Sequence, residues 1–357
     1  MQILFFTLLL IALLTYALWH VWAIVPLPHW AKWCIVAIAL LCFAMEFIGF
    51  TPLMHRLPLG VSSLIYNIGN KSLIIILYLI IAFLLLDVGR LVHIVPRSLL
   101  HDSLPATACI TVLLGVVFVC GSIHYHNKQR VELSADSRGK LPQPVKVVMA
   151  SDLHIGYHNR RSDLSKWIEL VNAEKPDLVL FAGDILDYSM RPVLEEGMAE
   201  EFRRIEAPTY ACLGNHEYYS GLNDAIQFYA DAGINLLRDS SVTFRNMTII
   251  GRDDRTNPDR RTLAELKGEE KNYTILLDHQ PYNLEEAEKA GIDFQFSGHT
   301  HNGQVWPLTL IIKHMYECAW GSHQRGATQY YVTSGLGIWG AKYRIGSQSE
   351  YIVLTIK

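Results

Sequence analysis

Four apolar segments near the N-terminus place the strongest constraint on how this chain of 357 residues folds. The first 123 residues carry 8 charged side chains, whereas the other 234 carry 57. Lipid offers no hydrogen-bond partners to backbone groups, so such segments are predicted to cross a bilayer as helices. This distribution excludes both a purely soluble enzyme and a purely membrane-embedded transporter, and it predicts a helical membrane region, residues 1–123, joined to a soluble domain. The four predicted helices comprise residues 3–25, 33–50, 71–95 and 106–123.

Basic residues near the predicted helix ends indicate the orientation. Four helices place both ends of the membrane region on one side, which carries four basic residues against three on the opposite side. Since Lys and Arg are enriched in cytoplasmic loops, this small excess predicts a multi-pass protein of the cell membrane with its soluble domain in the cytoplasm. Membrane lipids are then expected partners. The four residues are Arg56, Lys71, Lys128 and Arg130, and the three are Lys32, Arg90 and Arg97.

A cleaved signal peptide is the alternative interpretation of the first apolar segment. Signal peptides begin with basic residues and end at a cleavage site of small residues. No basic side chain precedes this segment and no clear site of that kind follows it, so we favour a retained helix.

The composition also bears on partners and on disulfides. The formal net charge is −3, whereas nucleic-acid-binding proteins usually show a basic excess, so no nucleic-acid binding is expected. The six cysteines form none of the CxxC spacings of zinc ribbons or redox motifs. The oligomeric state does not follow from the composition.

The remaining residues divide into a linker and a domain. Residues 124–144 are polar and contain Gly139, Pro142 and Pro144, which predicts a juxtamembrane linker and entry into the domain. From residue 145 to residue 357, short β-branched segments alternate with candidate helices, which predicts an α/β domain with buried sheets. The predicted strands are residues 145–150, 178–182, 209–213, 274–277, 294–296, 330–332 and 351–356. The predicted helices are residues 163–173, 193–205, 224–232 and 284–290.

Five of the predicted strands end in residues that can bind metals. Ligands in open α/β sheets gather beyond the carboxyl ends of the strands, so these residues are expected to converge on one site. Imidazole, carboxylate and amide oxygen without thiolate suit Mn²⁺, Fe or Zn²⁺ rather than a closed structural zinc site. Eight candidates exceed the needs of one ion, and two ions ~3.5–4 Å apart would use them to clamp an in-line displacement at phosphorus. The candidates are Asp152, His154, Asp184, Asn215, His216, His279, His299 and His301.

Each of these clusters also has a purely structural interpretation. Gly-Asp and Asp-Leu-His sequences commonly form turns or helix caps, and a single histidine such as His279 is often structural. The spacing of His299 and His301 is a weak motif, because alternate residues of any strand face the same side. Five such clusters, all at strand ends, are difficult to explain as independent turns, so we favour a metal site.

The five clusters together resemble the motifs of the calcineurin-like metallophosphoesterase superfamily, which are DxH, GD, GNH(D/E), a single His and GHxH. The stretches SDLHIG, GDILD, GHTHNGQVWP, TQYYVTSGLG and GSQSEYIVLTI are similar to the membrane-associated branch typified by the YkuE and YaeI phosphodiesterases. The chain departs from the superfamily at Asn302, where Gly is more frequent, and at residues 280–282, which bears on substrate preference. The matching motifs are DLH at 152–154, GD at 183–184, GNHE at 214–217, His279, and GHTH at 298–301.

This resemblance implies a fold, a metal centre and an activity. The fold would be a sandwich of two mixed β-sheets flanked by helices. Metal-activated hydroxide would hydrolyse a phosphate ester or pyrophosphate bond, and His216 would stabilise the developing charge and protonate the leaving group. One divalent ion would be bound by Asp152, His154 and His301, a second by Asn215, His279 and His299, and Asp184 would bridge both.

Three functions remain open from the sequence. The first is a membrane-anchored phosphoesterase that acts on a lipid-linked phosphate or pyrophosphate. The second is the same hydrolysis on a soluble nucleotide or phosphodiester, with the helices as a tether. The third is a membrane sensor or scaffold that binds metal without turnover.

Residues around the motifs suggest supporting roles. Asp187 is expected to support the ligands or to cap a helix rather than to bind metal. Either Glu217 or Asp152 is expected to orient the imidazole of His216.

Two segments outside the motifs have alternative interpretations. The charged loop 252–270 is either a rim that holds an anionic substrate or a solvated surface loop. The apolar segment 308–315, flanked by Trp306 and Trp320, either lines a groove for an acyl chain, dips into the bilayer interface or belongs to the core, and we favour the core.

Overall fold

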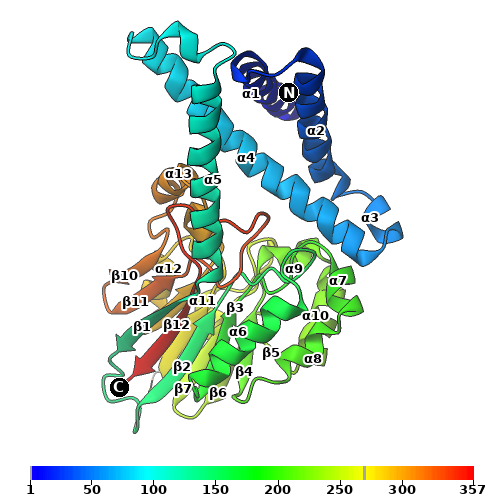
Figure 1. Ribbon diagram of the computed structural model, residues 1–357. Coiled ribbons are helices and arrows are strands. Elements are labelled where there is room, and N and C mark those ends of the chain that lie inside the picture. Colours follow the sequence, from blue (N-terminus) through cyan, green and yellow to red (C-terminus); the bar gives the residue numbers. More distant parts are fainter. Residues whose placement is uncertain (1, 268–270) are drawn as a thin grey trace. The chain divides into compact units, whose positions relative to one another are not determined.

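The chain forms two compact units, Met1–Cys120 and Gly121–Lys357, in a computed structural model that describes residues 2–267 and 271–357 (Figure 1). The first unit is entirely helical. Its helices are α1 (Gln2–Ile24), α2 (His29–Ile48), α3 (Leu53–Arg56), α4 (Leu59–Leu91), the short 3₁₀ helix η1 (Arg97–Leu99) and most of α5 (Leu104–His126).

Helix α4 differs most from the expected membrane spans. It begins at Leu59, twelve residues before the predicted start at 71, and runs for 33 residues. The apolar pattern did not predict this extension, because its first turns contain polar residues. Their side chains donate hydrogen bonds to backbone carbonyl oxygens of the same unit: Ser62 to Met54 at 2.8 Å, and Asn67 to Ser63 at 2.7 Å. Gly69 allows close packing on α2, since a Cβ atom there would lie 2.5 Å from the backbone nitrogen of Glu46.

Three helices of this unit, α2, α4 and α5, are long and apolar enough to cross a membrane. The side chains of α1 are described from Leu8 onward, and the apolar stretch Leu8–Ile24 is shorter than these three helices. The described residues therefore supply three clear candidate spans where the sequence predicts four.

The second unit contains two mixed six-stranded sheets (Figure 1), which confirms the predicted sandwich. Both sheets combine parallel and antiparallel neighbours. The first sheet has the order β1 (Gln129–Ala135), β12 (Glu350–Ile356), β2 (Val145–Ala150), β3 (Leu178–Ala182), β4 (Thr209–Cys212) and β5 (Asn235–Leu236). The second has the order β10 (Gly321–Arg325), β11 (Thr328–Val332), β9 (Phe294–Ser297), β8 (Tyr273–Leu277), β7 (Met247–Gly251) and β6 (Ser240–Phe244).

Alternate residues of the central strands build two separate apolar layers, because successive side chains of a strand point to opposite faces. Val147 and Met149 of β2 face the second sheet and pack in one cluster with Ile275 and Phe296. Val148, between them in sequence, belongs to the cluster on the outer face. The two sheets therefore enclose one core and bury each other's inner face.

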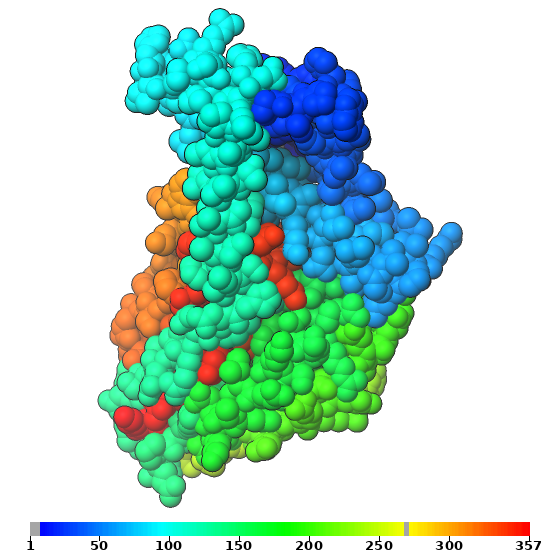
Figure 2. Space-filling model, in the orientation of Figure 1, coloured from blue at the N-terminus to red at the C-terminus, as the bar shows by residue number. Residues whose placement is uncertain are grey.

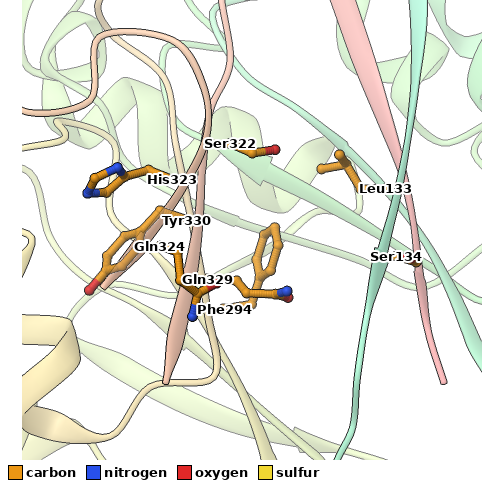
Figure 3. Close-up of a pocket in the computed structure, with 8 residues that line it drawn as sticks. All are labelled: Leu133, Ser134, Phe294, Ser322, His323, Gln324, Gln329 and Tyr330. Atoms are coloured by element: carbon orange, nitrogen blue, oxygen red, sulfur yellow. The ribbon is translucent and has the colours of Figure 1, made fainter. Parts of the chain in front are cut away.

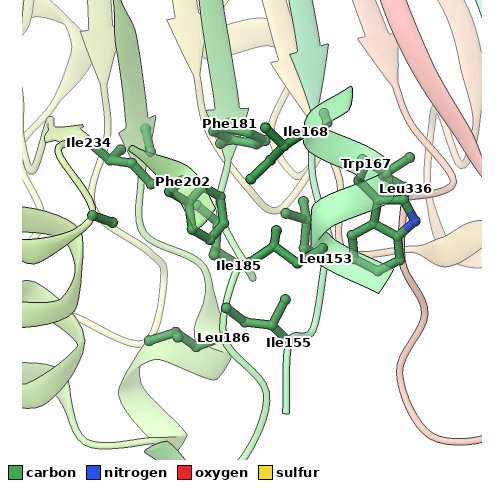
Figure 4. Close-up of a cluster of buried hydrophobic side chains, with 14 of the residues drawn as sticks. Leu153, Ile155, Trp167, Ile168, Phe181, Ile185, Leu186, Phe202, Ile234 and Leu336 are labelled. Atoms are coloured by element: carbon green, nitrogen blue, oxygen red, sulfur yellow. The ribbon is translucent and has the colours of Figure 1, made fainter. Parts of the chain in front are cut away.

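Helices cover the outer face of the first sheet. Phe181 of β3 packs there with Trp167, Ile168 and Phe202 (Figure 4), and the space-filling view shows the covering segments in green (Figure 2). The covering helices are α6 (Arg161–Ala173), α7 (Met190–Glu195), α8 (Met198–Phe202), α9 (Asn215–Tyr219) and α10 (Leu222–Asp231). The second sheet packs with α11 (Leu263–Leu266) and α12 (Glu285–Ala290).

Three segments of this unit differ from the sequence predictions. The predicted linker 124–144 contains β1, which pairs in parallel with β12. The predicted helix 193–205 is two short helices, because Gly197 adopts a φ of 61° between them. The apolar segment 308–315 is not core: it forms α13 (Leu308–Met315), on which Leu310 and Ile311 are about half exposed.

Candidate metal centre

The loops that follow β2, β3, β4, β8 and β9 bring all eight candidate residues together. Within each sheet these strands run parallel, so their carboxyl ends lie at the same edge. The potential ligand atoms form three groups, and within each group all the atoms lie within 4.8 Å of one another. The groups are Asp152, His154 and His301; His154, Asp184 and His216; and Asp184, His279 and His299.

The first group is buried, with Asp152 and His154 inaccessible to solvent and His301 slightly exposed. His154 Nε2 lies 3.1 Å from His301 Nε2, and Asp152 Oδ1 lies 3.4 Å from His301 Nε2. Two imidazole nitrogens and a carboxylate oxygen therefore converge on one point, which is the arrangement that a divalent cation requires.

Asp184 connects this group with the third one, which contains His279 and His299. Its Oδ2 lies 3.7 Å from His154 Nε2 and 3.1 Å from His279 Nε2. Its Oδ1 accepts a hydrogen bond from the backbone nitrogen of His216, at 2.9 Å. Asn215 adds an oxygen to the third group, because its Oδ1 lies 2.9 Å from His299 Nδ1. Asp184 thus occupies the central position that a bridging ligand would have.

The backbone around the site is unusually strained. Five of the seven predicted ligands have positive φ angles, between 46° and 70°, in the left-handed region that non-glycine residues seldom adopt. Such conformations cost about 1–3 kcal/mol each and gather at functional sites. The five residues are Asp152, His154, Asp184, His299 and His301.

Two motif glycines allow the chain to pass close to the carboxylates. A Cβ atom on Gly214 would lie 2.2 Å from Asp184 Oδ1, and one on Gly298 would lie 2.2 Å from Asp152 Oδ2. Any larger residue would displace the carboxylate. This contact explains why glycine stands before Asn215 and before His299.

The donor atoms suit bound cations. The Nδ1 atom of His279 donates to the carbonyl oxygen of Ala182 at 2.7 Å, so Nε2 faces Asp184 and is the atom that could donate an electron pair to a cation. This Nε2 atom is buried without a hydrogen-bond partner. A buried acceptor of this kind, beside carboxylates, fits a metal ligand.

The charged side chains of the site shift the pKa values of Asp184 and His216. Burial raises the pKa of Asp184, but the nearby His279 and His216 outweigh it and hold that pKa well below its ordinary value. Burial lowers the pKa of His216, but Asp184 and Asp187 outweigh it and raise that pKa to about 9. A cationic His216 beside the cluster is able to donate a proton.

Asp187 faces the imidazoles of His154 and His216. Its place beside His154 agrees with the supporting role predicted for it, and beside His216 it takes the position predicted for Glu217 or Asp152. Its Oδ1 lies 3.5 Å from His154 Nδ1 and 3.4 Å from His216 Nδ1. Glu217 instead accepts backbone hydrogen bonds from Gly214, Asp184 and Leu186. The spacing of Asp187 three residues after Asp184 was the only sequence signal for its position.

Replacing Asp187 with asparagine is expected to weaken Mn²⁺ binding and activity by roughly 10–100-fold, because carboxylates that orient metal-binding histidines contribute on this scale. Titration of the full-length protein with Mn²⁺ measures the affinity. Asp231→Asn on the surface of α10 is the matched control and should leave the affinity unchanged. Equal affinities in both variants would contradict this role for Asp187.

Arg344 supports the loop of His301 and was not anticipated from the sequence. Its side chain is fully buried, and Nη1 donates to the carbonyl oxygen of His301 at 2.7 Å. Nη2 donates to the carbonyl oxygens of Gly337, at 3.0 Å, and of Ser334. Burial lowers the pKa of Arg344 to about 10, so the side chain stays cationic at neutral pH.

The charged loop is mostly structural. Arg252 and Arg260 are largely buried and pair with Asp278, at 3.4 Å and 3.1 Å. Arg255 is exposed, and its guanidinium carbon lies 4.6 Å from the ring centre of Tyr282. Residues 268–270 of the loop lie outside the described residues.

A pocket elsewhere in the second unit provides a contrast with the cluster. Its lining contains no carboxylate, and His323 is its only imidazole among the residues drawn in Figure 3. His323 pairs with the exposed Glu317 instead. Of the pocket and the strand-end cluster, only the cluster combines carboxylates with several imidazoles.

Comparison with known proteins places this cluster in a family. The calcineurin-like phosphoesterase family matches residues 145–303. An uncharacterized metallophosphoesterase of Campylobacter jejuni is 30% identical over 256 residues, which cover 69% of this chain and 68% of the relative. The uncharacterized metallophosphoesterase YkuE of Bacillus subtilis is 30% identical over 228 residues, 59% of this chain and 79% of the relative.

A relative that is named as a transmembrane protein matches over a longer part of the chain. The zebrafish (Danio rerio) protein named transmembrane protein with metallophosphoesterase domain is 27% identical over 311 residues, 78% of this chain and 71% of the relative. Its name agrees with the apolar helices of the first unit and indicates membrane association. The motifs, the two-sheet fold and these relatives lead to one conclusion: the chain belongs to the calcineurin-like metallophosphoesterase family and is a metal-dependent phosphoesterase.

Proposed function

We propose that this phosphoesterase is a multi-pass membrane protein that hydrolyses the phosphate ester or pyrophosphate bond of a lipid-linked substrate. The observation that carries the proposal is the convergence of two carboxylates, five histidines and an asparagine at the carboxyl ends of five strands. The apolar helices of the first unit support a membrane location, and the charge bias favours a cytoplasmic catalytic domain.

Seven side chains are proposed to hold two divalent cations. When bound, the cations supply Lewis-acid chemistry, which lowers the pKa of a water molecule and neutralises charge on the phosphoryl oxygens. The donor set of nitrogen and oxygen atoms suits Mn²⁺, Fe or Zn²⁺. Asp152, His154 and His301 would hold the first, Asn215, His279 and His299 would hold the second, and Asp184 would serve both.

His216 is proposed as the general acid. Its Nδ1 faces Asp187, which holds the ring and leaves Nε2 free to donate to a phosphoryl oxygen or to the leaving oxygen. The ring packs edge-on against His154, with centroids 4.5 Å apart, so it lies next to the proposed reaction site. General acid catalysis of this kind contributes about 10²–10⁴-fold to the rate.

A soluble nucleotide is the second candidate substrate, and the exposed Arg255 favours it. This guanidinium stacks on Tyr282, whose hydroxyl donates to the hydroxyl of Tyr316, at 2.9 Å. The ring of Tyr316 lies 6.4 Å from that of His299. A cation and aromatic faces near the cluster would suit a base and its phosphates.

Parallel assays separate these candidates. Full-length protein with Mn²⁺ is expected to hydrolyse bis(4-nitrophenyl) phosphate, and to cleave a lipid-linked pyrophosphate with a higher kcat/KM than the matching nucleotide without its lipid. A higher kcat/KM for the free nucleotide would support the second candidate. Two bound metal ions without hydrolysis of any of these substrates would favour the non-catalytic sensor or scaffold and contradict the proposal.

A further inference from the structure

Helix α13 presents apolar side chains to solvent immediately after the last metal-binding motif. Leu310 is 49% exposed, Ile311 is 54% exposed and Met315 is 59% exposed. Trp306, just before the helix, is 45% exposed. Soluble domains seldom expose contiguous apolar side chains without a binding partner, so this surface calls for an occupant.

A groove of about 260 Å³ runs along one side of this helix. Its lining includes His301, a proposed metal ligand, and Gly303. Leu308, Ile311 and Ile312 of α13 and Trp339 from a separate loop supply the apolar part of the lining. The groove therefore shares a residue with the candidate metal centre and is lined largely by apolar side chains.

The contacts of Gly303 hold the metal-binding loop against α13. Its φ angle is 70°, and a Cβ atom would lie 2.6 Å from the backbone nitrogen of Thr309. Only glycine allows the short 3₁₀ helix η2 (His301–Gly303) to lie directly against α13. The apolar helix is thus held beside the metal-binding loop by the backbone itself.

Besides His301, the polar side chains that line the groove are Thr300 and Gln304, and both are already hydrogen-bonded. Thr300 Oγ1 donates to the carbonyl oxygen of Ala319 at 2.6 Å. Gln304 Nε2 donates to the carbonyl oxygen of Trp339 at 3.1 Å, and Gln304 Oε1 accepts from the backbone nitrogen of Trp339 at 3.3 Å. These bonds anchor the loop of Trp339 and leave the amide little capacity to bind a polar ligand. The groove consequently offers mainly apolar contacts.

We infer that the groove holds the hydrocarbon chain of a phosphate ester whose phosphoryl group lies at the metal centre. The inference rests on the proposed function, and it identifies the lipid part of the substrate. The shared lining supports this occupant, because the groove that Ile311 and Trp339 line also includes His301, a proposed metal ligand. Burial of several methylene groups would favour long chains strongly over short ones.

A pair of esters that differ only in chain length tests the inference. Full-length protein, kept soluble in an amphipathic polymer without detergent and supplied with Mn²⁺, is assayed with 4-nitrophenyl methyl phosphate and 4-nitrophenyl octyl phosphate as monomers. We expect kcat/KM to be roughly 10–50-fold higher for the octyl ester, since each buried methylene contributes to binding. The ratio of kcat/KM for the octyl ester to kcat/KM for the methyl ester is expected to fall about tenfold in Ile311→Asn and in Trp339→Ala.

Leu310→Asn is the matched control. Leu310 lies on the same helix and is similarly exposed, but it does not line the groove, so the ratio should stay at its wild-type value. Equal kcat/KM for both esters in the wild type would overturn the inference, as would an equal loss of preference in Leu310→Asn, which would indicate adsorption to the helix surface. Hydrolysis of neither ester by the wild type would contradict the proposed function itself, and the inference with it.

Discussion

Replacing Asp184 with asparagine is expected to lower kcat for bis(4-nitrophenyl) phosphate by roughly 10³-fold or more, which corresponds to at least about 4 kcal/mol of transition-state stabilisation. Asp184 is the carboxylate that reaches both halves of the cluster, with Oδ2 at 3.1 Å from His279 and 3.7 Å from His154. Asparagine keeps the shape but removes the charge that would offset the repulsion between two cations.

The folded state of this variant needs its own control. The bond from the backbone nitrogen of His216 to Asp184 Oδ1 can persist with an amide oxygen, so the variant is expected to fold. Its thermal unfolding should resemble that of Asp231→Asn, a surface control on α10 that keeps full activity. A folded Asp184→Asn protein with more than a tenth of wild-type activity would rule out the proposed bridging role.

Replacing Arg344 with methionine is expected to destabilise the catalytic domain by about 3–5 kcal/mol, because three carbonyl oxygens lose a cationic donor in a fully buried place. For a domain of this size the midpoint of thermal unfolding should fall by roughly 10 °C. Loss of intrinsic fluorescence on heating the full-length protein measures this change. Activity at low temperature should also decrease, since His301 loses the support of its backbone.

An exposed arginine provides the comparison. The side chain of Arg245 is 50% exposed and pairs with Asp177 at 2.9 Å. Surface ion pairs contribute about 0–1 kcal/mol, so Arg245→Met should shift the unfolding midpoint by only a few degrees. If both arginine variants unfolded at the same temperature, the supporting role of Arg344 would be refuted.

The catalytic fold was predictable because its central strands are buried and end in polar clusters. Val147 to Ala150 read as a continuous apolar strand, and Asp152 follows it after one residue, Ser151. The same pattern recurs at Asp184, so the convergence of Asp152 and Asp184 could be expected from neighbouring parallel strands. His279 follows a strand of the second sheet, and its approach to Asp184 depends on how the two sheets pack.

Features that depend on distant partners could not be predicted in this way. Strand β1 alternates exposed Arg130 and Glu132 with less exposed residues, and its pairing with β12 brings together segments about 220 residues apart. Asp187 and Arg344 act through contacts that only the folded chain defines. The exposure of α13 was also missed, because an apolar segment alone does not distinguish a core helix from one that faces solvent or lipid.

Metal content tests the central claim most directly. Full-length protein and its Asp184→Asn variant are dialysed to equilibrium against Mn²⁺, and the bound metal is measured by mass spectrometry. The account predicts two tightly bound ions per wild-type chain and at most one in the variant. A wild-type chain that binds no ion, or a variant that still binds two with unchanged affinity, would contradict it.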